Sequence, residues 1–136
     1  LRPNALALAA ADIAWWQQYP DAHDFAGRKF CSRKIPGTEI PTAPVVPLNG
    51  LNSGALAMLV ARQLGFGRML LLGFDGHGGH YHGRYAPPLN NSGPEQFARH
   101  RLQFAQVRTA LSADIVNCTP GSAITAFRAS TLRNEI

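Results

Sequence analysis

Three of the five histidines in this 136-residue chain lie within six residues of one another. His77, His80 and His82 alternate with glycines in the segment GFDGHGGHYHGRY, which follows an aliphatic run and contains Asp75. An imidazole changes its charge near neutral pH, so histidines in a loop can transfer a proton during a reaction or contact a ligand. If the chain is an enzyme, we expect His80, His82 and Asp75 to be its catalytic groups.

The same four side chains have enough donor atoms to bind zinc, which is a second interpretation of the segment. Against it, a flexible glycine-rich loop would lose much conformational entropy in arranging them, and no helical H-x-x-x-H spacing fixes two histidines on one face. A polar surface loop is a third interpretation. We favour a loop that folds over a bound ligand, in which the glycines allow a close approach, and we expect no cofactor.

Two further segments place polar side chains at the start of a predicted helix, where free N–H groups and the helix dipole attract anions. The first, NGLNSGALA, would bind a phosphate, although the same residues are typical of an ordinary helix cap. Its candidate residues are Asn52, Ser53 and Gly54. The second, NCTPGSAITAF, would hold a phosphate or a ribose, again with capping as the alternative. Its candidate residues are Asn117, Thr119 and Ser122.

Short apolar runs predict the strands that must position these segments. They lie at 5–9, within GRKFCSRK, at 69–72 and within ADIVNC, with one more short strand at Val45 and Val46. Asp12 is a good N-cap for a helix that carries Trp15 and Trp16, and a second helix covers 54–64 and stops at Gly65.

A third helix follows the histidine segment, and the last residues form a short fourth one. Ser92 and Glu95 have the spacing of a capping box, with Pro94 just inside the helix. An apolar stripe on one face must pack on a sheet. Its residues are Phe97, Phe104, Val107 and Leu111.

The order of these elements predicts an α/β fold. A helix that leads straight into a strand that is apolar on both faces is half of a βαβ unit, which requires a parallel sheet. We therefore expect one Rossmann-like domain over 1–136, with a three-layer α/β/α arrangement and a mostly parallel sheet. Ligands of such folds bind at the carboxyl ends of the strands.

Composition narrows the function classes. The chain is 46% hydrophobic and 15% charged, as globular proteins are, and it has neither a run of about 20 apolar residues nor a secretory signal. We expect a cytoplasmic protein without a membrane partner. Cys31 and Cys118 are interpreted as small buried hydrophobes, with a disulfide or a reactive thiol as alternatives. At least one of Trp15 and Trp16 should be buried, whereas an exposed pair would indicate a partner such as a second copy of the chain.

The net charge of +5 favours phosphorylated small molecules or polyanions as partners. Apart from the group at 28–34, the basic residues are scattered, and no aromatic stacking pattern accompanies them. This distribution argues against nucleic acid as the partner.

The ordered set of motifs resembles a group of phage-encoded and prophage proteins. These are related to flagellin-modifying motility-accessory glycosyltransferases and, more distantly, to bacterial sialyltransferases with a Rossmann-like fold. The resemblance covers most of the chain and includes AADIAWWQQY, FAGRKFC, LNSGALAMLVARQLGFGRMLLLGFDGHGGHYHGRYAPPLNN and IVNCTPGSAITAF. Proteins of this kind usually start with a strand and a glycine-rich turn. Neither precedes Leu1 in this sequence, so we expect that the chain is a fragment without its first strand.

The resemblance implies roles for individual residues. NSG at 52–54 matches the helix start that contacts the nucleotide phosphate, and GFD, with Gly73 and Asp75, matches a strand end beside the nucleotide. TPGS at 119–122 matches a second polar loop at that edge. An HxHG-like motif of the phage group matches His80, Tyr81, His82 and Gly83.

These observations together predict a domain that binds a nucleotide or a nucleotide sugar and that is a phage-encoded glycosyltransferase if it is active. In that hypothesis His80 or His82 is the general base on an acceptor hydroxyl, His77 contacts the ligand, and Tyr81 or Tyr85 assists the departing phosphate. One alternative is a non-catalytic phage protein that sequesters a nucleotide-derived ligand. Another is a metal-dependent hydrolase built on the aspartate and histidines of the loop, and the last is a structural or interaction protein of the virion that binds no ligand.

Overall fold

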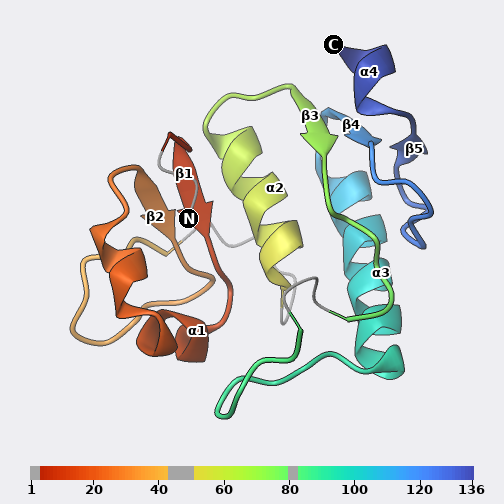
Figure 1. The fold of residues 1–136 in the computed structure, drawn as a ribbon. Coiled ribbons are helices and arrows are strands. Elements are labelled where there is room, and N and C mark those ends of the chain that lie inside the picture. The colour runs from red at the N-terminus through yellow and green to blue at the C-terminus, as the bar shows by residue number, and fades with distance from the viewer. Residues whose placement is uncertain (1–3, 43–50, 80–82) are drawn as a thin grey trace. The chain divides into compact units, whose positions relative to one another are not determined.

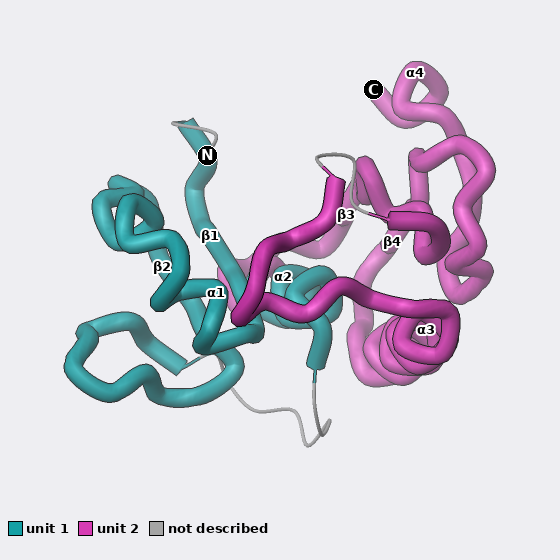
Figure 2. Tube along the Cα trace, turned by 60° about the horizontal axis from the view of Figure 1, so that its bottom comes forward, with its two compact units in different colours: residues 1–60 teal, residues 61–136 magenta. Residues whose placement is uncertain are grey.

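The computed structural model describes residues 4–42, 51–79 and 83–136. The chain divides into two compact units, Leu1–Val60 and Ala61–Ile136, which Figure 2 colours separately. Each unit is described by itself below, and the expectation of one domain over 1–136 stays a prediction.

The first unit contains a complete βαβ motif. Strand β1 (Ala7–Ala9) leads through helix α1 (Ile13–Gln18) and the 3₁₀ helix η1 (Pro20–Asp24) to strand β2 (Arg28–Phe30). The two strands pair in parallel, with Ala7 opposite Arg28 (Figure 1). Helix α2 (Ser53–Gln63) begins in this unit and ends in the second.

Local sequence explains where these elements begin and end. The carboxylate of Asp12 accepts a hydrogen bond from the backbone N–H of Ala14 at 2.9 Å, which confirms the predicted N-cap of α1. Pro20 follows the helix and cannot extend it. Gly27 lies so close to the start of β1 that a Cβ would come within 2.6 Å of the carbonyl oxygen of Leu6. Only glycine fits there.

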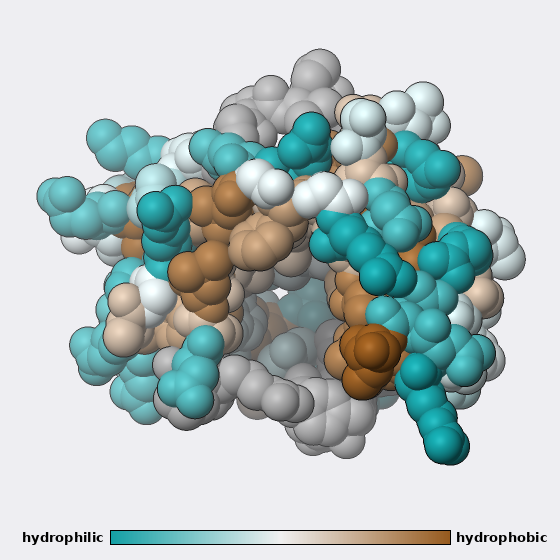
Figure 3. Space-filling model, turned by 90° about the horizontal axis from the view of Figure 1, so that it is seen from above, coloured by the Kyte–Doolittle hydropathy of each residue, from teal (hydrophilic) through white to brown (hydrophobic). Residues whose placement is uncertain are grey.

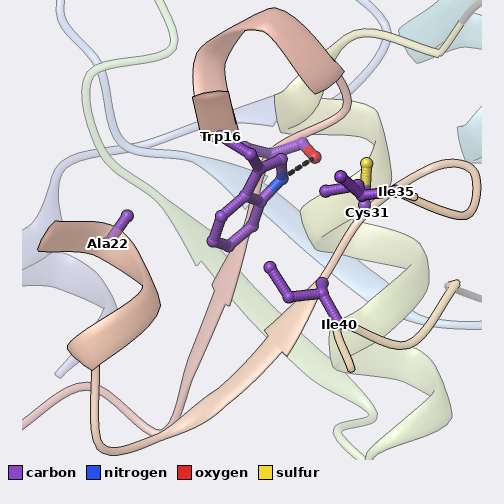
Figure 4. Packing of buried hydrophobic residues seen from close by; sticks show 6 residues of the cluster. Trp16, Ala22, Cys31, Ile35 and Ile40 are labelled. Carbon is purple, nitrogen blue, oxygen red and sulfur yellow. Dashed lines mark hydrogen bonds between the residues drawn. The ribbon is translucent and has the colours of Figure 1, made fainter. Parts of the chain in front are cut away.

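Trp16 is the centre of the apolar core of the first unit. Its side chain is completely buried, and its indole Nε1 donates a hydrogen bond to the carbonyl oxygen of Ala10 at 3.0 Å (Figure 4). The prediction that at least one tryptophan is buried is therefore confirmed. The buried cluster consists of Ala10, Trp16, Ala22, Cys31, Ile35 and Ile40.

The second unit is built on a parallel sheet of three strands. Strand β3 (Arg68–Leu71) precedes helix α3 (Pro94–Ala110), which returns the chain to strand β4 (Asp114–Asn117). Strand β5 (Arg128–Ala129) and helix α4 (Leu132–Glu135) follow. The strand order is β3-β4-β5, with Arg68 opposite Asp114 and Val116 opposite Arg128. Helix α3 lies along one side of this sheet (Figure 1).

The predicted apolar stripe of α3 is confirmed. Phe104, Val107 and Leu111 are buried and Phe97 is half-buried. The ring of Phe104 lies edge-on to that of Phe74, with the ring centres 5.8 Å apart, and contacts Phe127 in the same way. These rings join the helix to the loops after β3 and β4.

The structure confirms a mixed α/β fold in which all strand pairs are parallel among the described residues. The helix predicted at 54–64 is α2, and Gly65 ends it with a φ of +95°. The strand predicted at 5–9 is shorter, and the strand that Val45 and Val46 were expected to form lies outside the described residues. In the part of the chain that the structure describes, no helix has the length and apolarity needed to cross a membrane.

Two local predictions were wrong. Helix α3 starts at Pro94, so its N-cap is Gly93 rather than Ser92, and no side chain caps it. Proline at the first helical position moves the cap to the residue just before it, which breaks the Ser92–Glu95 capping box. Leu72 was expected in a buried strand, but β3 ends at Leu71 and 56% of Leu72 is exposed.

Candidate functional site

The loops that follow β3 and β4 are joined at the carboxyl ends of these strands. The backbone N–H of Phe74 donates to Oγ1 of Thr119 at 2.8 Å. The carbonyl oxygen of Phe74 accepts from Oγ of Ser122 at 2.5 Å and from Nδ2 of Asn117 at 3.2 Å. We call residues 73–77 together with residues 117–122 the β3–β4 edge.

The next two carbonyl groups of the first loop are also held. The carbonyl oxygen of Asp75 accepts from the backbone N–H of Ala123 at 2.7 Å, and that of Gly76 accepts from Nη1 of Arg101 on α3 at 2.9 Å. Gly76 has a φ of +71°, and a Cβ there would lie 2.6 Å from Cγ1 of Ile124. Three successive carbonyl groups at the start of the glycine-rich loop are therefore bonded to residues far away in the sequence, and the flexibility expected of the rest of the loop stays a prediction.

Asp75 and His77 are presented by this fixed segment. Asp75 is half-buried, and its Oδ1 accepts a hydrogen bond from the N–H of Gly76 at 3.0 Å. His77 is exposed, and its Nε2 lies 3.1 Å from the carbonyl oxygen of Gly121 in the loop after β4. A carboxylate and an imidazole thus lie two residues apart in the sequence at the carboxyl edge of a parallel sheet, which is where α/β folds bind their ligands.

Asn117, Thr119 and Ser122 lie at the same edge, as predicted, but their polar atoms hold the loops together. The helix expected to start after them was wrong, because residues 118–127 form turns that lead into β5. Oδ1 of Asn117 accepts from the N–H of Thr119 at 3.1 Å, and its Nδ2 donates to Oγ of Ser122 at 2.8 Å. Oγ of Ser122 also accepts from the N–H of Ile124 at 3.0 Å. Asn117 is buried, and hydrogen bonds of its side-chain amide offset the free-energy cost of removing this polar group from water. A direct role of these residues in binding stays a prediction.

The predicted phosphate-binding helix start lies in the first unit. Oδ1 of Asn52 accepts from the N–H of Ala55 at 2.9 Å, so the capping interpretation of Asn52 is confirmed. Oγ of Ser53 accepts from the N–H of Ala11 at 3.0 Å, just beyond β1. Helix α2 therefore begins at the carboxyl end of a parallel strand. Phosphate binding by Asn52, Ser53 and Gly54 stays a prediction.

The remaining predicted residues are only partly described. Gly73 follows β3 with a φ of +76°. The N–H and carbonyl groups of Tyr85 are both bonded to the side chain of Asn91, at 2.7 and 2.9 Å. The roles predicted for His80, Tyr81 and His82 fall outside the described residues. No group of three or more metal-binding side chains occurs within 4–42, 51–79 and 83–136, and the metal hypothesis, which needs His80 and His82, stays untested.

A group of ion pairs lies at the other end of the sheet, where the three strands begin. Glu135 of α4 contacts Arg128 at 2.7 Å and Arg68, at the start of β3, at 2.5 Å. Hydrogen bonds from Arg128 above all, and from Ser130 and Arg68, lower the pKa of Glu135 to about 2. Burial, with a smaller contribution from Arg99, lowers the pKa of His100 on α3. Glu135 therefore links the C-terminal helix to the start of β3 and to β5.

Among the described residues, the exposed large apolar side chains come from elements far apart in the sequence. Hydrophilic residues make up much of the face that Figure 3 shows, with apolar residues between them. The exposed large apolar residues come from many places in the chain: Leu6, Tyr19, Phe66, Leu72, Leu102, Leu132 and Ile136. Both cysteines are buried and unpaired, as small hydrophobes would be, which confirms that interpretation of Cys31 and Cys118.

Sequence reasoning missed two residues that shape the site. Arg101 lies outside the predicted apolar stripe of α3, yet its side chain reaches the carbonyl oxygen of Gly76, 25 residues earlier in the chain. The side chain of Ile124, which lies 48 residues later in the chain, leaves no room for a Cβ at position 76. No pattern of neighbouring residues predicts contacts between positions so far apart in the sequence. Comparisons of the sequence with family models and curated proteins, and a comparison with solved structures, found no match.

Proposed function

We propose that the chain binds a nucleotide or a nucleotide sugar, with the β3–β4 edge as its contact to the ribose or sugar. The observation that carries this proposal is the fixed segment 74–76, whose carbonyl oxygens are all bonded within the protein and which holds Asp75 at the carboxyl edge of a parallel sheet. A pre-organised site loses less entropy on binding than a loop that must fold around its ligand.

The chemistry of Asp75 suits a ligand rich in hydroxyl groups. A carboxylate only accepts hydrogen bonds, and one oxygen of Asp75 is used by the N–H of Gly76. The other oxygen has no hydrogen bond to any residue that the structure describes. Acidic side chains at the carboxyl ends of strands bind ribose hydroxyls in nucleotide-binding α/β proteins. The net charge of +5 favours the approach of a phosphorylated molecule.

Helix α2 is a separate candidate contact for an anion within the first unit. Its start is fixed to the end of β1 by the hydrogen bond between Ser53 and Ala11. An eleven-residue helix that begins there presents backbone N–H groups and the positive end of its dipole to an anion.

The proposal extends to fold and activity. We place the chain among Rossmann-like three-layer proteins of the cytoplasm and among phage-encoded relatives of the motility-accessory glycosyltransferases; the parallel strand pairs and the quoted motifs support this placement.

In a transferase, His80 or His82 would take the proton of the acceptor hydroxyl. His80→Ala or His82→Ala, whichever removes that base, should lower turnover by about 10²- to 10⁴-fold and leave nucleotide affinity nearly intact. Unchanged turnover in both variants would contradict this role.

Calorimetric titration with uridine and cytidine nucleotides and their sugar conjugates tests the binding proposal. Asp75→Asn keeps the size of the side chain and an oxygen for the N–H of Gly76 but removes the charge. We expect it to weaken binding by about 10- to 150-fold, the effect of losing one hydrogen bond to a charged group. Asp21→Asn changes an exposed aspartate of η1 and serves as the matched control. Equal affinities of the wild type and Asp75→Asn would show that the ligand binds elsewhere.

A further inference from the structure

The hydrogen bond between His77 and Gly121 determines which ring nitrogen of His77 carries the proton. Nε2 of His77 lies 3.1 Å from the carbonyl oxygen of Gly121, and a carbonyl oxygen can only accept a hydrogen bond. Nε2 must therefore donate. In the neutral ring, Nδ1 then carries no hydrogen and has a free lone pair.

Both partners of this bond are held in place by the β3–β4 edge. His77 directly follows the segment whose carbonyl groups are bonded to Ser122, Ala123 and Arg101. Gly121 directly precedes Ser122, whose hydroxyl group is tied to Phe74. The ring of His77 is exposed, and its Nδ1 has no hydrogen bond to a residue of the described ranges. The hydrogen bond to Gly121 thus favours one tautomer in an exposed side chain whose Nδ1 has no described partner.

Two accepting groups therefore come from one short segment. Asp75 contributes a carboxylate oxygen and His77 contributes Nδ1, and neither can donate a hydrogen bond while the imidazole is neutral. A phosphate oxygen is also an acceptor, so it gains nothing from either group. A hydroxyl group has the hydrogen that both groups lack.

We infer that Nδ1 of His77 accepts a hydrogen bond from a hydroxyl group of the ligand, so the β3–β4 edge selects a ribose or sugar hydroxyl and not a phosphate. This inference rests on the proposed binding of a nucleotide or nucleotide sugar. It adds the atom of His77 that is used and the part of the ligand that it contacts.

Nitrogen-15 NMR spectra of the imidazole rings in the full chain test the inference. They are recorded at a pH at which the titration curve of His77 itself shows a neutral ring. We expect the Nε2–H tautomer, and we expect a uridine or cytidine nucleotide sugar to move the Nδ1 signal in the direction of hydrogen-bond acceptance. Inorganic phosphate alone should leave the signal in place. His23 is an internal control, because its Nε2 bonds to the carbonyl oxygen of Trp16 at 3.1 Å; its tautomer should match, but its signal should not respond.

A substitution at His77 separates the effect of its Nε2 donor from that of its Nδ1 acceptor. His77→Gln keeps an N–H donor near the position of Nε2 and removes Nδ1. It should weaken binding of the nucleotide sugar by about 2- to 12-fold, the range for one neutral hydrogen bond, and leave the binding of phosphate unchanged. His23→Gln should change neither.

The results that would overturn the inference differ from those that would overturn the proposed function. An Nδ1–H tautomer, a response of His77 to phosphate alone, or calorimetric binding of the nucleotide sugar with an unmoved Nδ1 signal would overturn the inference and leave the proposed function intact. Absence of calorimetric binding for every nucleotide and nucleotide sugar would overturn both.

Discussion

Gly76 illustrates how a single residue shapes the candidate site. Its φ of +71° favours glycine, and the side chain of Ile124 occupies the place where a Cβ would lie. Its carbonyl oxygen is the anchor for Arg101. The position therefore couples the conformation of the Asp75 segment to α3 and to the loop after β4.

A pair of glycine variants measures this coupling. Gly76→Ala adds a Cβ that must displace Ile124 and adopt a left-handed conformation, so we expect it to lower the free energy of unfolding by more than about 2 kcal/mol. Gly78 has a similar φ of +76°, but apart from its two chain neighbours no atom of a described residue lies within 4 Å of the place of a Cβ. Gly78→Ala should therefore cost only about 1 kcal/mol. Denaturant unfolding measures both values, and equal losses would show that Ile124 does not restrict position 76.

Ser53 has a comparable role in the first unit. Ser53→Ala removes the acceptor for the N–H of Ala11 and should lower the free energy of unfolding by about 1 kcal/mol. Ser53→Thr keeps the hydroxyl group and is the matched control. If both variants unfold at the same denaturant concentration as the wild type, the bond between α2 and the end of β1 does not contribute to stability.

At the scale of elements, α4 is fastened to the sheet by charge. Glu135 contacts Arg68 of β3 and Arg128 of β5, and Arg68 also lies 3.3 Å from Asp114 of β4. Because the pKa of Glu135 falls from 4.5 to about 2 on folding, its contribution is fully present above pH 4.5 and is lost as the pH falls toward 2.

Glu135→Gln should make stability less dependent on pH in that range. The wild type should lose free energy of unfolding between pH 4.5 and 2 relative to this variant, as measured by urea unfolding at each pH. Glu39→Gln changes an exposed glutamate that forms no ion pair with any described residue, so it should keep the wild-type slope. Parallel curves for wild type and Glu135→Gln would contradict the ion-pair account.

Helix α3 contains a second group whose titration is coupled to folding. Burial and Arg99 lower the pKa of His100 below 6.5, so between 6.5 and the lower folded value the unfolded chain binds the proton and the folded chain does not. Stability should therefore fall as the pH decreases through this window, and His100→Gln should reduce the fall.

In an NMR titration, Arg99→Gln should raise the pKa of His100 by less than the whole difference from 6.5, since burial is the larger cause. A pKa that stays the same in Arg99→Gln would exclude the charge effect.

At the scale of the whole molecule, the sequence predicted the elements better than the contacts between them. Apolar runs and caps such as Asp12 and Gly65 depend on neighbouring residues, so β1, α1, α2, β3 and β4 were found within a few residues. The capping box at Ser92 failed because a competing local signal, Pro94, determined the helix start. The parallel pairing was also predictable, because it follows from helices that alternate with buried strands.

The candidate site was only partly predictable for a physical reason. Asp75, Asn117, Thr119 and Ser122 were correctly expected at the ends of strands, because neighbouring parallel strands end at one edge. The hydrogen bonds that join the two loops were not predictable, since Phe74 and its partners Asn117, Thr119 and Ser122 lie 43 to 48 residues apart in the sequence. A polar residue in a turn has the same local pattern whether it binds a ligand or holds two loops together.

The most direct test of the proposed function is a thermal-shift screen of the purified chain against nucleotides, nucleotide sugars, inorganic phosphate and divalent metals. A ligand at 100 times its dissociation constant stabilises the folded state by about 2.7 kcal/mol, which raises the melting temperature measurably. We expect a selective rise with a uridine or cytidine nucleotide or its sugar conjugate, and a smaller rise in Asp75→Asn. A rise with zinc alone, or no rise with any nucleotide, would contradict the proposed function.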